Sequence, residues 1–231
     1  TSVNFPIYHH DGVFVCNGMG IMRDEHLGSY HLFGGFEKPL PNATKGGTGY
    51  FADSDDAMHF PSTPTPLIIN ATGRFDTNPA WRFNADSSTY VGYVRGLRVG
   101  DFPPYDREGC GEWYPQCAAR KGCPKSACDA SFRTFARLES PSLSGPYTAT
   151  IPEQPATKEH QTYTFAPFRF HDIWLGTASV FEETTAPTDK GFVRCSLFLT
   201  ADEAKGPWVS IGDKPGGDDF IPLGAKGSFD F

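Results

Sequence analysis

The 231-residue chain is long enough for one domain with a substantial core and too short for several. Its 39 % hydrophobic content, with 25 Gly and 20 Pro, predicts a folded, turn-rich protein rather than a disordered one. The net charge of −7 disfavours nucleic acid and anionic membranes as partners and favours neutral or cationic ligands. No apolar run reaches the length of a transmembrane helix, so we expect no membrane insertion.

Short aromatic and aliphatic runs, separated by polar and Gly-containing breaks, predict β-strands in three successive groups. No window shows the i, i+3, i+4, i+7 apolar pattern of a long helix. The first group places strands at residues 13–16, 30–33 and 49–52. A polar connection through Arg23, Asp24 and Glu25 joins the first two of them.

The second and third groups repeat this arrangement and share an ending. The second places strands at residues 80–83, 90–95 and 132–138, with an Asx- and Ser-rich turn at 84–88. The third places strands at residues 163–170, 173–181 and 192–200. Both groups close on a Gly-Pro-aromatic sequence, at Gly145-Pro146-Tyr147 and at Gly206-Pro207-Trp208, and a fourth copy begins at Gly227-Ser228-Phe229-Asp230.

Antiparallel meanders that recur every 60 to 70 residues, roughly, are typical of β-propeller blades with long loops. A β-sandwich also has short strands and regular turns, but it does not account for the repeated Gly-Pro-aromatic ending. The sequence therefore predicts one all-β domain over residues 1–231, a β-propeller of about three blades and the start of a fourth. We expect it to be incomplete at its C-terminal side and interrupted by a cysteine-rich loop insertion at about 100–131.

Several features predict a secreted, extracellular glycoprotein. The chain opens on Thr1 rather than Met, as it does after a signal peptide is removed. Asn42 and Asn70 each begin an N-glycosylation sequon in loop sequence. One Gly/Pro-rich segment contains four cysteines, Cys110, Cys117, Cys123 and Cys128. They favour two disulfides over a zinc knot, because only Cys123 and Cys128 approach the spacing of zinc ligands. Cys16 and Cys195, inside strand-like runs, fit free thiols as well as a bridge.

A family resemblance enters at the third group. The runs at residues 163–170 and 173–176, followed by 220–224 and 227–230, resemble secreted five-bladed propellers similar to the glycoside hydrolases of the invertase and arabinanase type. The unit from Phe75 to Arg95 fits the same pattern, and the resemblance covers most of the chain except the cysteine insertion. It implies a five-bladed propeller whose innermost strands bring acidic residues to an axial funnel for a glycan. It implies no cofactor.

Glycoside hydrolysis needs one carboxyl group as proton donor and one carboxylate as base or nucleophile. Asp76 and Asp230 each follow a Phe at the start of a presumed innermost strand, so they are the candidate catalytic residues. Glu159, just before the third group, is a weaker counterpart. The invertase-like proteins place three carboxylates in their first three blades, and this chain does not show that triad in clear motifs.

Two functions follow from this pattern. The first is an exported glycoside-hydrolase-like propeller that binds or hydrolyses a glycan in its funnel. The alternative is a non-catalytic carbohydrate-binding or structural module of an extracellular assembly, with other protein subunits as partners. Tyr163 and Arg169 of the third group, and Trp113 of the cysteine insertion, are the candidate sugar-binding residues. Trp174 and Trp208, in regular positions, are predicted to lie in the core between blades.

No metal site is predicted. Asp53, Asp55 and Asp56 resemble part of a calcium loop, but the Gly and the distal Glu of such a loop are missing, which favours a solvated turn. His9 and His10 are adjacent, and adjacent side chains of a strand point to opposite faces, so they do not readily hold one ion together.

Overall fold

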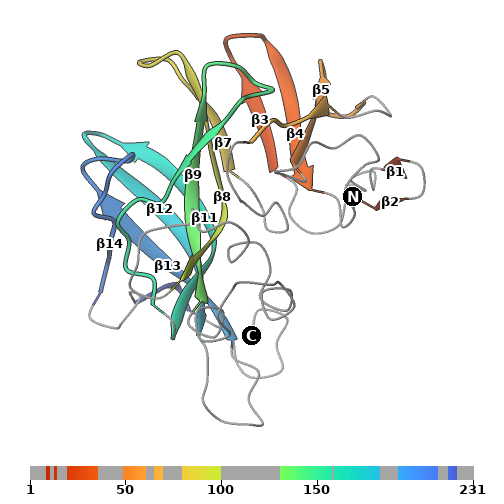
Figure 1. The fold of residues 1–231 in the computed structure, drawn as a ribbon. Helices are drawn as coiled ribbons and strands as arrows, with labels where there is room; N and C mark the ends of the chain where they lie inside the picture. The colour runs from red at the N-terminus through yellow and green to blue at the C-terminus, as the bar shows by residue number, and fades with distance from the viewer. Residues whose placement is uncertain are drawn as a thin grey trace. The chain divides into compact units, whose positions relative to one another are not determined.

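The computed structural model describes residues 9–10, 13–14, 20–35, 49–60, 65–69, 80–99, 131–157, 159–182, 192–212 and 218–222. These residues form strands, bridges, turns and irregular connections, and no helix occurs among them. The chain divides into two compact units, one of residues 1–94 and 137–149 and the other of residues 95–136 and 150–231. Within the described ranges, three larger antiparallel sheets follow one another along the sequence (Figure 1).

The first sheet has the strand order β3-β4-β5-β6. Its strands are β3 (Gly20–Asp24), β4 (Ser29–Gly35), β5 (Gly49–Ser54) and β6 (Thr65–Pro66). The predicted strands at residues 30–33 and 49–52 are confirmed. The prediction of a polar connection at Arg23 and Asp24 is wrong, because both belong to β3, where exposed and buried side chains alternate. The buried residue that ends this alternation is an aspartate, which made the strand look like a loop.

A separate two-stranded sheet precedes the first one. It pairs β1 (His9–His10) with β2 (Val13–Phe14), with His9 opposite Phe14. Residues 13–14 of the strand predicted at 13–16 are confirmed as a strand, but they pair with β1 and not with the first large sheet, and residues 15–16 lie outside the described residues.

The second sheet has the order β10-β9-β8-β7. Its strands are β7 (Ala80–Asn84), β8 (Thr89–Val99), β9 (Ser131–Ser140) and β10 (Thr148–Thr150). The predicted strands and the turn at 84–88 are confirmed, and the Asn84 Oδ1 atom accepts the Asp86 N–H at 3.3 Å in that turn. The border between the two compact units crosses β8 after Val94 and β9 after Ala136.

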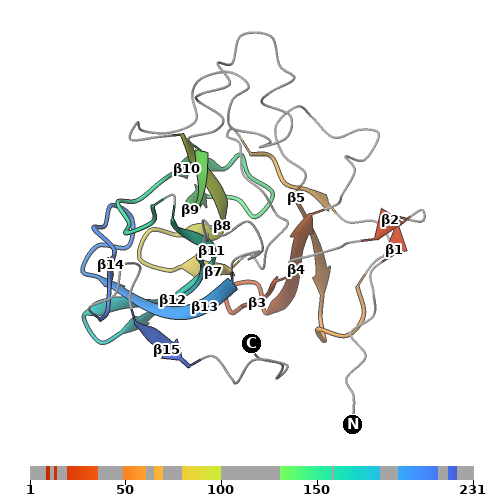
Figure 2. The ribbon, with the colours of Figure 1, turned by 90° about the horizontal axis from the view of Figure 1, so that it is seen from below.

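The third sheet has the order β11-β12-β13-β14, and β15 also pairs with β13. Its strands are β11 (His160–Phe170), β12 (Ile173–Glu182), β13 (Phe192–Thr200), β14 (Val209–Ser210) and β15 (Asp219–Ile221). All three strands predicted for this group are confirmed. Figures 1 and 2 show the long strands β11, β12 and β13 side by side.

The two Gly-Pro-aromatic endings have the same local structure. The Tyr147 N–H donates to the Ile68 carbonyl at 2.7 Å, and the Trp208 N–H donates to the Glu153 carbonyl at 2.7 Å. Both glycines have a positive φ and lie so close to the same two carbonyls that an added Cβ would approach within 2.3 Å at Gly145 and 2.5 Å at Gly206. Glycine is therefore required at both places, because it alone combines this φ with this close approach. The predicted repeat is confirmed in atomic detail.

An aromatic cluster repeats with these endings and forms the core of each unit. In the first unit, Trp81 of β7 stacks on Phe33 at 4.4 Å between ring centroids and meets Tyr147 edge-on at 4.9 Å. In the second unit, Phe165 of β11 stacks on Phe135 at 3.9 Å and meets Trp208 edge-on at 4.8 Å. Trp208 is buried as predicted.

Each cluster also needs a glycine on the strand beside it. An added Cβ would lie 2.6 Å from the Trp81 ring at Gly92 and 2.3 Å from the Phe165 ring at Gly176. Trp174, also predicted for the core, is only half-buried. The all-β class and three blade-like sheets are thus confirmed. The start of the fourth blade, at residues 227–230, lies outside the described residues.

Candidate functional site

Most of the residues predicted for the site lie outside the described part of the chain. They are the candidate acids Asp76 and Asp230, the candidate sugar-binding Trp113, the sequon residues Asn42 and Asn70, and the cysteines Cys16, Cys110, Cys117, Cys123 and Cys128. The described candidates are Glu159, Tyr163 and Arg169, all in or next to β11. Cys195 is a half-buried free thiol, and burial raises its pKa.

The three described candidates do not form one group. Glu159 is exposed and accepts a hydrogen bond from the Thr157 hydroxyl at 3.2 Å. Arg169 is exposed at the other end of β11, where its Nε donates to the His171 carbonyl at 3.2 Å. Six residues of extended strand, about 20 Å, separate Arg169 from Tyr163. Tyr163 therefore lies near the start of β11, with Glu159 just before the strand, and Arg169 lies near its other end.

Tyr163 occupies an irregularity in the β11–β12 pairing. The register shifts between Thr162 and Thr164, so Tyr163 is the extra residue of a β-bulge. A bulge turns a side chain out of the regular alternation, and bulges are frequent beside functional sites. The guanidinium groups of Arg95 and Arg133 both lie 5.6 Å from the Tyr163 ring centroid, which is within cation–π range.

Arg133 is held in place by one amide and two rings. Its backbone N–H and its Nη1 both donate to the Gln161 Oε1 atom, each at 3.1 Å. Its guanidinium also lies 5.0 Å from the Phe181 ring centroid. We call the group of Arg133, Gln161, Tyr163 and Phe181 the β11 rim. It combines aromatic rings with a planar cation that the buried Gln161 amide holds, and aromatic rings and guanidinium groups bind small polar ligands.

A charged network begins at His160 of β11 and Glu182 of β12, which lie opposite each other in the sheet. The Glu182 Oε1 atom accepts from the Arg194 Nε at 2.5 Å, and its Oε2 atom contacts the His160 Nδ1. The Arg194 Nη1 reaches the Ser196 hydroxyl at 2.5 Å and lies 3.7 Å from an Asp219 oxygen. We call these residues the Glu182 network. Because both oxygens of Glu182 are engaged by other side chains, this carboxylate holds its neighbours in position rather than standing ready for proton transfer.

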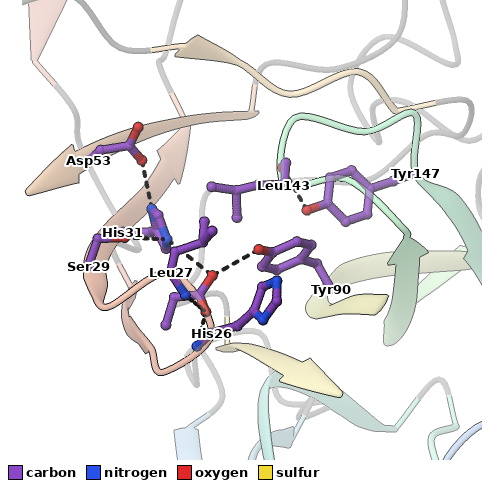
Figure 3. A network of polar contacts seen from close by, with 9 residues as sticks. His26, Leu27, Ser29, His31, Asp53, Tyr90, Leu143 and Tyr147 are labelled. Atoms are coloured by element: carbon purple, nitrogen blue, oxygen red, sulfur yellow. Dashed lines mark hydrogen bonds and ion pairs between the residues drawn. The ribbon is translucent and has the colours of Figure 1, made fainter. Parts of the chain in front are cut away.

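A second buried network lies in the first unit, around Asp24 and His31, and Figure 3 shows it. The His31 Nδ1 lies 2.6 Å from an Asp53 oxygen, and its Nε2 lies 3.4 Å from Asp24 Oδ2. The Tyr90 hydroxyl donates to the same Asp24 oxygen at 2.9 Å, and the backbone N–H groups of His26 and Leu27 donate to the other Asp24 oxygen. We call this the Asp24 network.

The environment of the Asp24 network shifts the pKa of two of its members. Burial raises the pKa of Asp24, but hydrogen bonds from Leu27, Tyr90 and His26 and the charge of His31 outweigh burial and leave it below its ordinary value. Burial and the hydrogen bond to Asp24 raise the pKa of Tyr90 to about 12. The network closes the turn after β3 and ties β8 to it, so it is explained by folding alone.

Of the three aspartates that resemble part of a calcium loop, Asp55 and Asp56 lie in the predicted turn, but Asp53 belongs to β5. One oxygen of Asp56 accepts the N–H groups of Met58 and His59 at 2.8 and 2.9 Å, and the His59 side chain lowers the pKa of Asp56. Among the described residues, no group of three or more His, Cys, Asp or Glu side chains could hold a metal ion. Those same residues contain no helix long and apolar enough to cross a membrane.

No protein-family model matches the sequence, and no curated protein matches it. Among solved structures, the chain is similar to a GH32 β-fructofuranosidase of Bombyx mori, at 13 % identity over 85 % of this chain and 34 % of that chain, with a TM-score of 0.48. It is similar to an exo-β-1,3-galactanase of Clostridium thermocellum, at 12 % identity over 93 % and 53 % of the two chains, with a TM-score of 0.44.

A third similar structure is a family 43 arabinoxylan arabinofuranohydrolase of Bacillus subtilis, at 16 % identity over 84 % of this chain and 35 % of that chain, with a TM-score of 0.42. The chain thus spans 34 %, 53 % and 35 % of the lengths of these three proteins. Likeness at this level says nothing about activity, and the three blades rest on the strand order of this chain.

Proposed function

We propose that this chain is part of a secreted, glycoside-hydrolase-like β-propeller that binds a glycan at the β11 rim. The observation that carries the proposal is Tyr163, a half-buried bulge residue whose ring lies beside two guanidinium groups, one of which the Gln161 amide holds. Sugars present apolar C–H faces and many hydroxyl groups, so a ring with polar planar neighbours suits them.

Binding is better supported than hydrolysis. Hydrolysis needs two carboxyl groups on either side of the scissile bond. Near the described rim, Glu182 is engaged by Arg194 and His160, and Glu159 is exposed to solvent. If the protein is an enzyme, Asp76 and Asp230 remain the proposed acid and base. If it is not, the same rim serves a carbohydrate-binding module of an extracellular assembly.

The test is a binding survey with a matched pair of variants. Calorimetry with arabino-, xylo-, fructo- and galacto-oligosaccharides should identify at least one ligand of the unmodified chain. Tyr163→Ala should then weaken its binding about tenfold, a loss of about 1.4 kcal/mol. Tyr30→Ala, which removes a half-buried tyrosine of β4, should leave binding unchanged. Equal loss in both variants, or binding that survives Tyr163→Ala, would remove the rim from the proposal.

Hydrolysis is tested separately by the release of reducing sugar from the same oligosaccharides. Asp76→Asn and Asp230→Asn should each abolish the release while leaving binding in place. Release that continues unchanged in both variants would remove these catalytic assignments. Binding without any release would leave the non-catalytic module as the function.

A further inference from the structure

We infer that the β11 rim binds a carboxylate group of an acidic glycan, with Arg133 as its counter-ion. This inference rests on the proposed function and names the class of glycan. The supporting observation is the difference between the cations in and next to the rim. Arg194 and His160 share the carboxylate of Glu182, and Arg194 has Asp219 as a second neighbour at 3.7 Å. In the described part of the chain, Arg133 contacts one amide and two rings and forms no ion pair with a carboxylate.

Arg133 also keeps hydrogen-bonding capacity. A guanidinium has five N–H donors in a planar fork. One side-chain nitrogen, Nη1, donates to Gln161, and Arg133 is half-buried. Within the described ranges, no further acceptor engages its remaining donors, so they can serve a ligand that reaches the rim.

The surroundings of Arg133 prepare it for an anion. The rings of Tyr163 and Phe181 lie 5.6 and 5.0 Å from its guanidinium carbon and restrict the side chain, so little further freedom is lost when a ligand binds. A planar fork matches the two oxygens of a carboxylate, and such charge-assisted pairs are about twice as strong as neutral hydrogen bonds. A sugar hydroxyl would use the same donors less well. The ligand class that fits best is a glycan with uronic acid residues.

The net charge of the chain favours neutral or cationic ligands and therefore opposes an acidic one. At −7, the protein as a whole repels an acidic glycan. An acidic ligand therefore needs a specific cation at its binding site. The sequence contains 20 Lys and Arg residues against 27 Asp and Glu, and within the described ranges Arg133 is a guanidinium that pairs with no carboxylate.

The experiment compares trigalacturonate with its methyl ester, which has the same sugars without the charge, and glucuronic-acid-substituted xylotriose with xylotriose. Calorimetry with the unmodified chain should show at least one acid bound tenfold or more tightly than its neutral partner. Arg133→Gln should reduce the affinity for the acid by roughly 10- to 100-fold and leave the neutral partner within threefold. Arg133→Lys keeps the charge but loses the planar fork of donors, so its affinity for the acid should lie between those of the unmodified chain and of Arg133→Gln. Arg23→Gln, at an exposed arginine of β3, should change neither the affinity for the acid nor that for its neutral partner.

The outcomes separate the two proposals. Equal affinity for acid and neutral partners, or an acid preference that survives Arg133→Gln, overturns the inference while a bound neutral glycan still supports the proposed function. Binding of no oligosaccharide at all overturns both. If Arg133→Gln does not fold, the acid-to-neutral ratio of the unmodified chain and of Arg133→Lys decides. Competition by inorganic sulfate as strong as that by galacturonate would overturn the assignment to a carboxylate.

Discussion

The Asp24 network and the Glu182 network use similar residues in different surroundings. Each joins a histidine to carboxylates across neighbouring strands. The side chains of Asp24 and His31 are 0 % and 2 % exposed, whereas those of Glu182 and His160 are 13 % and 25 % exposed. In the first network every contact closes a turn or ties two strands together. In the second, the network adjoins a group of rings and a guanidinium that has no carboxylate partner among the described residues.

This difference shows that a charged cluster inside a β protein does not by itself indicate a functional site. In the Asp24 network, both oxygens of the buried Asp24 carboxylate are engaged by Tyr90, His26 and Leu27. In the β11 rim, by contrast, the guanidinium of Arg133 pairs with no carboxylate of the described residues and keeps N–H donors beyond the one given to Gln161. We therefore expect the two regions to respond differently to substitution, in stability for the first and in ligand binding for the second.

The largest expected effect is that of Asp24→Ala. The substitution removes the acceptor of the Tyr90 hydroxyl and of two backbone N–H groups in a fully buried site. The free energy of unfolding should fall by about 3–5 kcal/mol, as measured by urea denaturation. Asp55→Ala, at an exposed aspartate, should change it by less than about 0.5 kcal/mol. A small effect of Asp24→Ala would mean that the network does not hold the turn.

Glu182→Ala should cost less, about 1–3 kcal/mol. It leaves the buried guanidinium of Arg194 without its closest carboxylate, but water reaches this network and Asp219 lies 3.7 Å away. The same denaturation experiment measures it. A cost as large as that of Asp24→Ala would contradict the distinction between a closed network and one beside a solvent-accessible rim.

The pH dependence of stability should single out Tyr90. Its pKa in the folded protein, about 12, lies above the ordinary value, so folding favours the neutral phenol. This stabilisation is complete below about pH 10 and is lost as the pH rises toward 12, by about 2 kcal/mol. Tyr90→Phe should cost about 1 kcal/mol at pH 7 and should remove this part of the alkaline loss. The free energy of unfolding of the unmodified chain and of Tyr90→Phe should be measured between pH 9 and 11.5. Parallel curves for the two proteins would contradict the role of Tyr90.

Asp53→Asn should have the smallest effect. Asp53 contacts the buried His31 at 2.6 Å, but its own side chain is 60 % exposed. Exposed members of ion pairs contribute little, so we expect a change below about 1 kcal/mol. A loss near that of Asp24→Ala would show that the exposed aspartate, rather than the buried one, organises the network.

Much of the fold was predictable from residue patterns. Aromatic and aliphatic runs gave the long strands of the third group, and the two Gly-Pro-aromatic endings gave the repeat, because both depend on local sequence. β3 was missed because its buried end is Asp24, whose partners Tyr90 and His31 come from other strands. Nothing in the local sequence indicates such a partner.

The site was less predictable for a similar reason. Tyr163 and Glu159 were named from their position at the start of a strand, and the structure leaves their roles as proposals. Arg133, Glu182 and Arg194 were not named. A signal did exist, since Arg133 and Arg194 each follow an apolar residue inside a strand-like run, and a charge inside a strand must be paired or lie at an accessible edge. Which of the two applies depends on contacts between strands.

The most direct test of the account is a map of amide hydrogen exchange with and without a bound oligosaccharide found in the binding survey. We predict that the ligand slows exchange at residues 131–135 and 159–163, which carry the β11 rim. Exchange at residues 22–31, which carry most of the Asp24 network, should not change. Slower exchange at residues 22–31, or no change at the rim while the ligand is bound, would contradict the account.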